Sequence, residues 1–377
     1  MNMPRSLEEI YKRYEFNKTE PETLSGLIES VIKKSDEIKD NFELYREITQ
    51  TIYEILVREN LIQKIELTSS DESYKKICSI GVDGSFQCVG GLGGIWYVPI
   101  SCSRVFLDNL SDLYPKVDVA ADIHDINEIE HPNLEKEASF RMLVGETKAI
   151  NEWISKFSPT KETVIFIDGP IVDPPWFSGD KRYSEYLRDR CSAIKRCMDK
   201  NVFLIGCVKR IMGRYLINHI RDKLAKNDDE KDRTKRFISD AHLVSHVFTK
   251  LSIKSPTSVF YTSPIPVSHT DETHEAYLKE GIDLYTIFMQ KDFSCRPIRL
   301  DIPILCDNGT NISEMAVKAI KMSALWTYPG QNWPLPVMLA HYKCNIRRGC
   351  AEVLYDEMIT RTTSPNLFDN VVRVKMR

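Results

Sequence analysis

The sequence lacks the long apolar run that a membrane-spanning helix requires. None of its hydrophobic stretches approaches about 18 residues, although hydrophobic residues form an ordinary 42% of the 377-residue chain. The first residues, MNMPRSLEEIYKRYEF, are charged from the start and lack the apolar centre of a signal peptide. We therefore expect a cytoplasmic globular protein without membrane contact, built of one large domain or two smaller ones.

Cysteine patterns typical of zinc sites are missing. The chain has 10 cysteines but no Cys-x-x-Cys pair. The closest pairs are Cys191 with Cys197 and Cys344 with Cys350, and both are too widely spaced for a typical zinc site. We interpret the cysteines as buried thiols in a reducing compartment.

Nucleotide-binding and hydrolase signatures are also absent. The glycine cluster GGLGG at 90–94 fits neither G-x-G-x-x-G nor the P-loop, and no Lys-Ser or Lys-Thr pair follows it. This argues against ATP binding by the loop. No Ser or Cys stands in a G-x-S-x-G setting. The chain contains no internal repeat and no low-complexity linker.

Two histidine groups do not match a known metal motif. His242 and His246 lie one helical turn apart in AHLVSH, but no Glu follows the first His as it does in the zinc proteases. His269, Asp271 and His274 fall together in SHTDETH, which we expect to be a loop. We interpret both groups as structural or surface histidines.

Global charge does not indicate nucleic-acid binding, because the formal net charge is only −3. Local charge is different. Residues 181–222 contain eleven Lys or Arg and four Asp or Glu, an excess of +7, whereas residues 111–137 are acidic. A charge run is usually a solvated face, but this basic segment directly follows Asp168, and it suggests phosphate binding.

Sequence periodicity predicts helices at both ends and strands between them. Apolar residues at three- and four-residue spacing predict helix over 6–67. Segments 76–84 and 94–107 predict two antiparallel strands, with Asp83 at the end of the first. Further helices are expected over 133–157, 181–199, 211–250, 311–325 and 334–360, and the third of these has a charged break at 226–235. Further strands are expected over 162–168, 201–210, 257–263 and 284–290, and the segment RPIRLDIP follows the last of them. This order predicts a mixed α/β fold around one central sheet.

Two aspartates follow apolar strands in similar settings. Asp83 stands in SIGVDG and Asp168 in VIFIDG. Carboxylates at strand ends can face an open crevice, and Mg²⁺ and Mn²⁺ prefer such oxygen ligands. Two metal ions held this way can support phosphodiester cleavage. The alternative is that each Asp-Gly pair closes a turn.

Five segments together carry a resemblance to a known family. GVDGSF, RMLVGETKAI, VIFIDGPI, GCVKR and LPVMLAH, spread over about residues 75–345, resemble the NurA-type nucleases in order and spacing. The resemblance implies a ribonuclease H-like, PIWI-like core with a mixed central sheet and flanking helices. It divides the chain into an N-terminal helical segment at 1–70 and a NurA-like nuclease domain at 71–377.

The resemblance also implies an activity and partners. NurA-type nucleases cut DNA with Mn²⁺, as 5′-to-3′ exonucleases and single-strand endonucleases. They are homodimers that act with a HerA-type hexameric ATPase in DNA end processing and repair or in phage defence. The carboxylate set suits Mg²⁺ as well as Mn²⁺.

Carried over residue by residue, the resemblance assigns a metal site. Asp83 and Asp168 are the outer carboxylates and His341 is the C-terminal histidine. The second carboxylate is a glutamate on the helix before Asp168. Glu146, 22 positions before Asp168, fits best, and Glu137 and Glu152 on the same helix stay open.

Further residues are expected to bind DNA. Lys209, on the strand after Asp168, could contact the scissile phosphate, and Arg210 and Arg214 could hold the DNA backbone. The family places an aromatic-proline pair before the histidine, and YPGQNWPLPVMLAH offers Tyr328 and Trp333. We choose Tyr328 for the position beside the metal. The expected reaction is metal-assisted hydrolysis with little sequence preference.

Two other functions stay open. The first is a dimeric adaptor that docks on a DNA-translocating ATPase and does not cut. The second is a ribonuclease H-like enzyme that acts on RNA or on a DNA–RNA hybrid.

Overall fold

The computed structural model describes residues 21–90, 94–109, 113–157, 159, 161–237, 239–267, 272–306, 309 and 311–361. The chain divides into two compact units, residues 1–54 and 55–377. The described residues of the first unit form one helix, α2 (Pro21–Arg58), whose last turn belongs to the second unit. None of the described helices combines the length and apolarity needed to cross a membrane.

Helix α2 confirms part of the N-terminal helix expected from the sequence. Residues 6–20 of that prediction lie outside the described part of the chain. Asn60, just after α2, has a left-handed φ of 51° that Asn tolerates. The helical prediction is wrong for β1 (Ile62–Ile65), which pairs antiparallel with β8 (Val259–Thr262). Cross-strand pairing here outweighs local helical periodicity.

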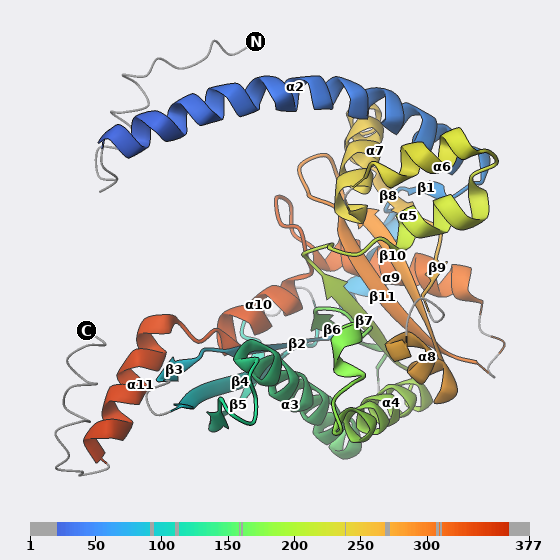
Figure 1. Ribbon diagram of the computed structural model, residues 1–377. Helices are drawn as coiled ribbons and strands as arrows, with labels where there is room; N and C mark the ends of the chain where they lie inside the picture. The colour runs from blue at the N-terminus through green and yellow to red at the C-terminus, as the bar shows by residue number, and fades with distance from the viewer. Residues whose placement is uncertain are drawn as a thin grey trace. The chain divides into compact units, whose positions relative to one another are not determined.

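Among the described residues, eleven strands form a single mixed sheet (Figure 1). Its order is β1-β8-β10-β11-β7-β6-β2-β4-β3, with β5 beside β4 and β9 beside β10. The remaining strands are β2 (Cys78–Phe86), β3 (Val89–Gly90), β4 (Ile95–Leu107), β5 (Lys116–Asn127), β6 (Thr163–Asp168), β7 (Val202–Val208), β9 (Ile265–Pro266), β10 (Ile282–Gln290) and β11 (Ile298–Leu305). Strands β2, β4 and β5 form an antiparallel meander, and β6 and β7 run parallel to β2. This confirms the expected ribonuclease H-like fold class.

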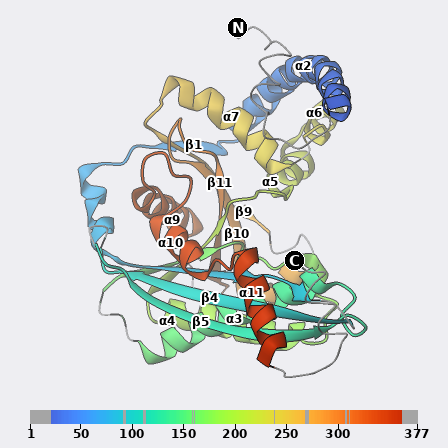
Figure 2. The same ribbon diagram turned by 90° about the vertical axis from the view of Figure 1, so that its left-hand side faces the viewer.

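Strand β5 was not predicted, although Val117, Val119, Ala121 and Ile123 alternate with other residues along it. It lies in the acidic segment, and nine of its twelve residues, including these four, are exposed. It is nevertheless a long strand, since its whole length pairs with β4, from Phe106 opposite Lys116 to Ile95 opposite Asn127 (Figure 2).

Side chains along β6 alternate between two apolar layers. Ile165 and Ile167 belong to a core that includes residues of α3 (Leu134–Lys156) and α4 (Tyr183–Asp199). Val164 and Phe166 belong to a second core, which includes residues of α9 (Ile312–Trp326) and α10 (Leu335–Cys344). Helices therefore cover both faces of the sheet, and the apolar run of β6 is that of a strand buried on both faces.

The segment after β7, where the sequence predicts helix over 211–250, folds into a series of helices. They are α5 (Tyr215–His219), the π-helical turn η4 (Ile220–Leu224), α6 (Asp228–Lys235) and α7 (Asp240–Lys254). The expected charged break at 226–235 is wrong, because most of it is α6. The Asn227 side chain caps this helix by accepting a hydrogen bond from the Glu230 N–H. Acidic residues in the first turn and basic residues in the last also favour it.

Two more helices differ from the prediction. The helix expected over 334–360 is interrupted after α10 and resumes as α11 (Arg348–Arg361). Helix α8 (Glu272–Lys279) was not predicted. It contains His274, whereas His269 and Asp271 lie outside the described residues. The short 3₁₀ segments η1 (Ser69–Lys76) and η3 (Pro175–Phe177) complete the described elements.

Helix α10 crosses β2 at close range, and Gly81 permits the crossing. A Cβ on Gly81 would overlap the carbonyl oxygen of Pro336 and lie 2.8 Å from the Val337 nitrogen. Further along α10, the Ser103 hydroxyl donates a hydrogen bond to the Ala340 carbonyl at 2.8 Å. The crossing therefore fixes the register in which α10 presents its next residue, His341, to the sheet.

The substitution Gly81→Ala should destabilise the protein. The added methyl meets helix backbone, which cannot move aside as a flexible side chain does, and such overpacking costs about 1–3 kcal/mol. Urea denaturation measures the loss. Gly349→Ala is the control, because Gly349 is exposed on α11 and a methyl added there has no neighbour within 4 Å. Ala also favours helix over Gly by up to about 1 kcal/mol. Equal stability of the two variants would contradict the close crossing.

Candidate active site

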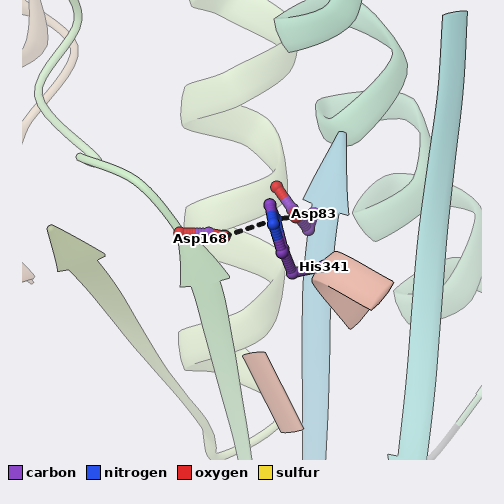
Figure 3. Close-up of side chains that lie close together, drawn as sticks. All are labelled: Asp83, Asp168 and His341. Carbon is purple, nitrogen blue, oxygen red and sulfur yellow. Dashed lines mark hydrogen bonds and ion pairs between the residues drawn. The ribbon is translucent and has the colours of Figure 1, made fainter. Parts of the chain in front are cut away.

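Three potential ligands from three elements converge beside the central sheet. Asp83 comes from β2, Asp168 ends β6, and His341 lies on α10. One ligand atom of each lies within 4.8 Å of the others. The His341 Nδ1 is 2.8 Å from Asp83 Oδ2 and 3.6 Å from Asp168 Oδ2 (Figure 3). The structure thus brings together three of the four ligands predicted from the sequence.

Parallel pairing explains why the two aspartates meet. Val82 of β2 is opposite Ile167 of β6, so Asp83 and Asp168 both come directly after the last matched pair. The expectation that Asp83 ends its strand is wrong. Strand β2 continues to Phe86, because its other edge stays paired with β4. Asp83 lies where the parallel pairing stops.

Glu146 is the helix glutamate that lies next to this cluster. It is 1% exposed and accepts a hydrogen bond from the backbone N–H of Gly84. Gly84 allows this approach, because a Cβ there would lie 2.7 Å from the Glu146 Oε1. The carboxylate of Glu146 is outside the set of ligand atoms within 4.8 Å of one another. Its negative charge nevertheless raises the pKa of Asp83.

The other two glutamates left open by the sequence lie elsewhere. Glu137 forms ion pairs with Arg182 at 2.6 Å and Arg141 at 2.7 Å. Hydrogen bonds from these two arginines outweigh the effect of burial and lower the pKa of Glu137 to about 2. Glu152 has a side chain that is 45% exposed and lies 4.0 Å from Lys148. Of the three, Glu146 alone faces the two aspartates.

Buried negative charge dominates the electrostatics of the cluster. Burial raises the pKa of Asp83 well above its ordinary range, and the charges of Asp168 and Glu146 raise it further. Burial also raises the pKa of Glu146 to about 8, although the nearby guanidinium of Arg190 opposes the shift. Protons therefore occupy part of the cluster at neutral pH when no cation is bound.

Lys209 is the cation that touches the cluster. Its Nζ forms an ion pair with Asp168 and lies 4.6 Å from the ring centroid of Trp333. Trp333 is therefore the aromatic residue near the site, and the placement of Tyr328 beside the carboxylates is wrong. Tyr328 lines a cleft, and none of the four candidate ligands does. The other lining residues are Glu72, Lys75, Lys76, Asp108, Asn109 and Lys161.

The two arginines expected to bind DNA follow Lys209 but differ in exposure. Arg210 is exposed, whereas Arg214 is half-buried and contacts the Lys235 carbonyl at 3.5 Å. Neither contacts the carboxylates. Both lie in the connection between β7 and α5.

Sequence reasoning missed two residues around the site. The Cys344 thiol, one helical turn after His341, donates a hydrogen bond to Asp83 Oδ2 at 3.3 Å. Its i+3 spacing from His341 is the signal that could have revealed it. Arg190 is 1% exposed on α4 and lies 3.5 Å from the Thr147 hydroxyl, next to Glu146. No sequence signal distinguishes it from the other arginines of this basic helix.

The donor set fits a divalent cation. Asp83 and Asp168 offer oxygen ligands, and His341 adds an imidazole nitrogen within reach of both. Burial and the charge of Lys209 lower the pKa of His341, which favours the neutral ring that ligates metals. A mixed carboxylate and imidazole set suits Mn²⁺ and admits Mg²⁺.

The histidine pair on α7 shows no such arrangement. His246 Nδ1 lies 2.8 Å from the backbone carbonyl of His242. In the part of the chain that the structure describes, neither residue belongs to a group of three potential ligands.

Comparison with known proteins identifies the family of this chain. The NurA domain profile matches residues 79–332, more than half of the chain, and His341 lies beyond the matched span. The crystal structure of the NurA nuclease from Sulfolobus solfataricus has a TM-score of 0.55 at 14% identity, covering 88% of this chain and 96% of that one. The catalytic domain of human endonuclease V has a TM-score of 0.34 at 12% identity, covering 79% and 94%. No curated protein sequence gives a significant match.

The raised carboxyl pKa values predict how stability depends on pH without metal. The folded protein retains protons that the unfolded chain releases near pH 4. Stability therefore falls as pH rises from about 4 towards 8, where Glu146 titrates. Asp83→Asn removes one charge of the cluster and should raise the free energy of unfolding at pH 8 by roughly 2 kcal/mol.

Thermal denaturation in a chelator measures this difference. It should shrink at pH 5, where protons already neutralise the cluster. Glu152→Gln provides the control, because that exposed carboxylate lies outside the cluster. A less stable Asp83→Asn protein at pH 8 would contradict the repulsion between these carboxylates.

Proposed function

Because this chain belongs to the NurA family of nucleases, we propose that it is a metal-dependent deoxyribonuclease that hydrolyses phosphodiester bonds. The observation that carries the proposal is the convergence of Asp83, Asp168 and His341 at one point beside the sheet. Buried carboxylates that repel one another are costly to maintain for stability alone. A site built to receive a cation and a phosphate explains the cost.

Asp83, Asp168 and His341 would hold the cation, with Glu146 as the fourth ligand. Mn²⁺ is the proposed ion and Mg²⁺ the second choice. A divalent cation supplies a more acidic water and offsets negative charge on the phosphoryl oxygens. The Gly84 N–H and the Cys344 thiol orient two of the carboxylates.

Lys209 has the position of a phosphate contact. Its ammonium lies at Asp168, and the Trp333 ring holds it there. When a phosphodiester enters, this ammonium can turn from the carboxylate to a non-bridging oxygen and stabilise the charge that grows in the transition state. Arg210 and Arg214, just beyond, would bind neighbouring phosphates.

The finer features of the proposal come from the family resemblance. They are 5′-to-3′ exonuclease and single-strand endonuclease activity, a homodimer, and a HerA-type hexameric ATPase as partner in DNA end processing and repair or phage defence. We also propose a cytoplasmic location and a division near residue 70. The nuclease proposal itself does not depend on these features.

Cleavage of end-labelled single- and double-stranded DNA in Mn²⁺ tests the function. Wild-type protein should cut, and Asp83→Ala or Asp168→Ala should lower the rate at least about 1,000-fold, because each removes a metal ligand. Glu152→Gln should cut at the wild-type rate, since Glu152 is exposed away from the cluster. The assay is run with and without a HerA-type ATPase.

The same assay separates the two alternatives. Matched RNA and DNA–RNA hybrid strands, if cut faster than DNA, would favour the ribonuclease H-like enzyme. If no divalent ion supports cutting of any strand, even with the ATPase present, the nuclease proposal fails in favour of the adaptor.

A further inference from the structure

Next to His341 lies an exposed segment that combines an aromatic ring with positive charge. Residues 341–348 read HYKCNIRR and contain no acidic residue. The Tyr342 side chain is 68% exposed, and Lys343 and Arg347 are exposed as well. An exposed aromatic beside cations is the composition that binds single-stranded nucleic acid by stacking bases and pairing phosphates.

This segment is continuous with the candidate active site. His341 is itself 49% exposed, so the site is open to solvent on this side. The Tyr342 ring stands edge-on to the His341 ring, with their centroids 6.2 Å apart. A nucleotide lying over His341 would therefore meet the Tyr342 ring first.

The residues directly after Tyr342 line a cleft. A hollow of about 690 Å³ lies between the α10–α11 connection and strands β4 and β5, and Lys343 and Arg347 line it. Its opposite wall is mainly apolar, and Asp122 is the one acidic residue in the described lining. Two cations on one wall can follow a phosphate backbone, and the remaining wall can accommodate sugars and bases.

The charges on this wall are available to a ligand. Within the described residues, no ion pair forms at Lys343 or Arg347, whereas the neighbouring Arg348 pairs with Glu352 at 3.1 Å. An unpaired surface cation binds phosphate without first breaking an internal ion pair, so each should add one phosphate contact.

We propose that Tyr342, Lys343 and Arg347 form a binding track for single-stranded DNA that leads away from His341. The Tyr342 ring stacks on an unpaired base next to the scissile phosphate, and the two cations bind phosphates further along the strand. The proposal rests on the proposed nuclease function and adds the path that a single strand takes from the site and the residues that bind it.

Binding of a fluorescein-labelled single strand of about 20 thymidines, followed by anisotropy in a chelator, tests the track without cleavage. Tyr342→Ala should weaken binding about tenfold, because stacking one base is worth about 1–3 kcal/mol. Tyr342→Phe keeps the ring and should stay within about twofold of wild type. A duplex of the same length offers no free base, so its affinity should not distinguish Ala from Phe.

The cations are tested by salt dependence. The double substitution Lys343→Gln with Arg347→Gln should reduce the slope of log affinity against log salt by about 1.4, or about 0.7 for each phosphate that is no longer neutralised. Matched controls come from the β4–β5 connection, at the far end of β4. Tyr114 there is 91% exposed and Lys116 begins β5. Tyr114→Ala and Lys116→Gln should bind as wild type does.

The outcomes separate the two proposals. If the wild-type protein neither binds nor cuts single strands, both the nuclease proposal and the binding track are wrong. If it cuts DNA but Tyr342→Ala and Tyr342→Phe bind the single strand equally, the nuclease function stands and the track is wrong. Equal weakening by Tyr114→Ala, or variants that alter only self-association, would overturn the track as well.

Discussion

The crowding of negative charge at Asp83, Asp168 and Glu146 is the constraint on which the rest of the structure depends. Two of these side chains are almost fully buried, and like charges in such a place repel strongly. Attraction between the ligands cannot assemble the site, so the packing of rigid elements must do so. Lys209, the Gly84 N–H and the Arg190 guanidinium reduce the repulsion without removing it. What remains is the free energy that a bound cation can recover.

Packing achieves this through close backbone approaches on the two sides of Asp83. Gly81 admits α10 on one face of β2, and Gly84 admits the Glu146 side chain from α3 on the other. Asp83 stands between them, where pairing with β6 ends. Two glycines therefore decide how near the histidine and the helix glutamate come. They explain the sequence G-V-D-G better than a turn does, since β2 continues past Gly84.

The sequence predicted those parts of the fold whose apolar pattern matches their burial. Strand β6 and helix α3 were predicted to within about a residue, because each carries a clear period. The prediction missed β5 because its apolar side chains are exposed and pairing with β4 holds the strand in place. The prediction missed β1 because its four residues are extended through pairing with β8. The prediction missed α6 because this helix has little apolar content. Its N-cap and the order of its charges favour the helix instead.

The residue types of the site could be predicted from the sequence. Which of several similar residues belongs to the site could not. Glu137 and Glu146 are nine residues apart, about 900° of helix rotation, so they point to opposite sides of α3. Periodicity shows that both cannot face the sheet, but only tertiary packing decides which one does. The same reasoning applies to α10. Val337, Ala340 and Cys344 form its buried stripe, so the helical period places Tyr342 on the exposed side. The packing that fixes His341 thus also places an exposed aromatic ring beside it.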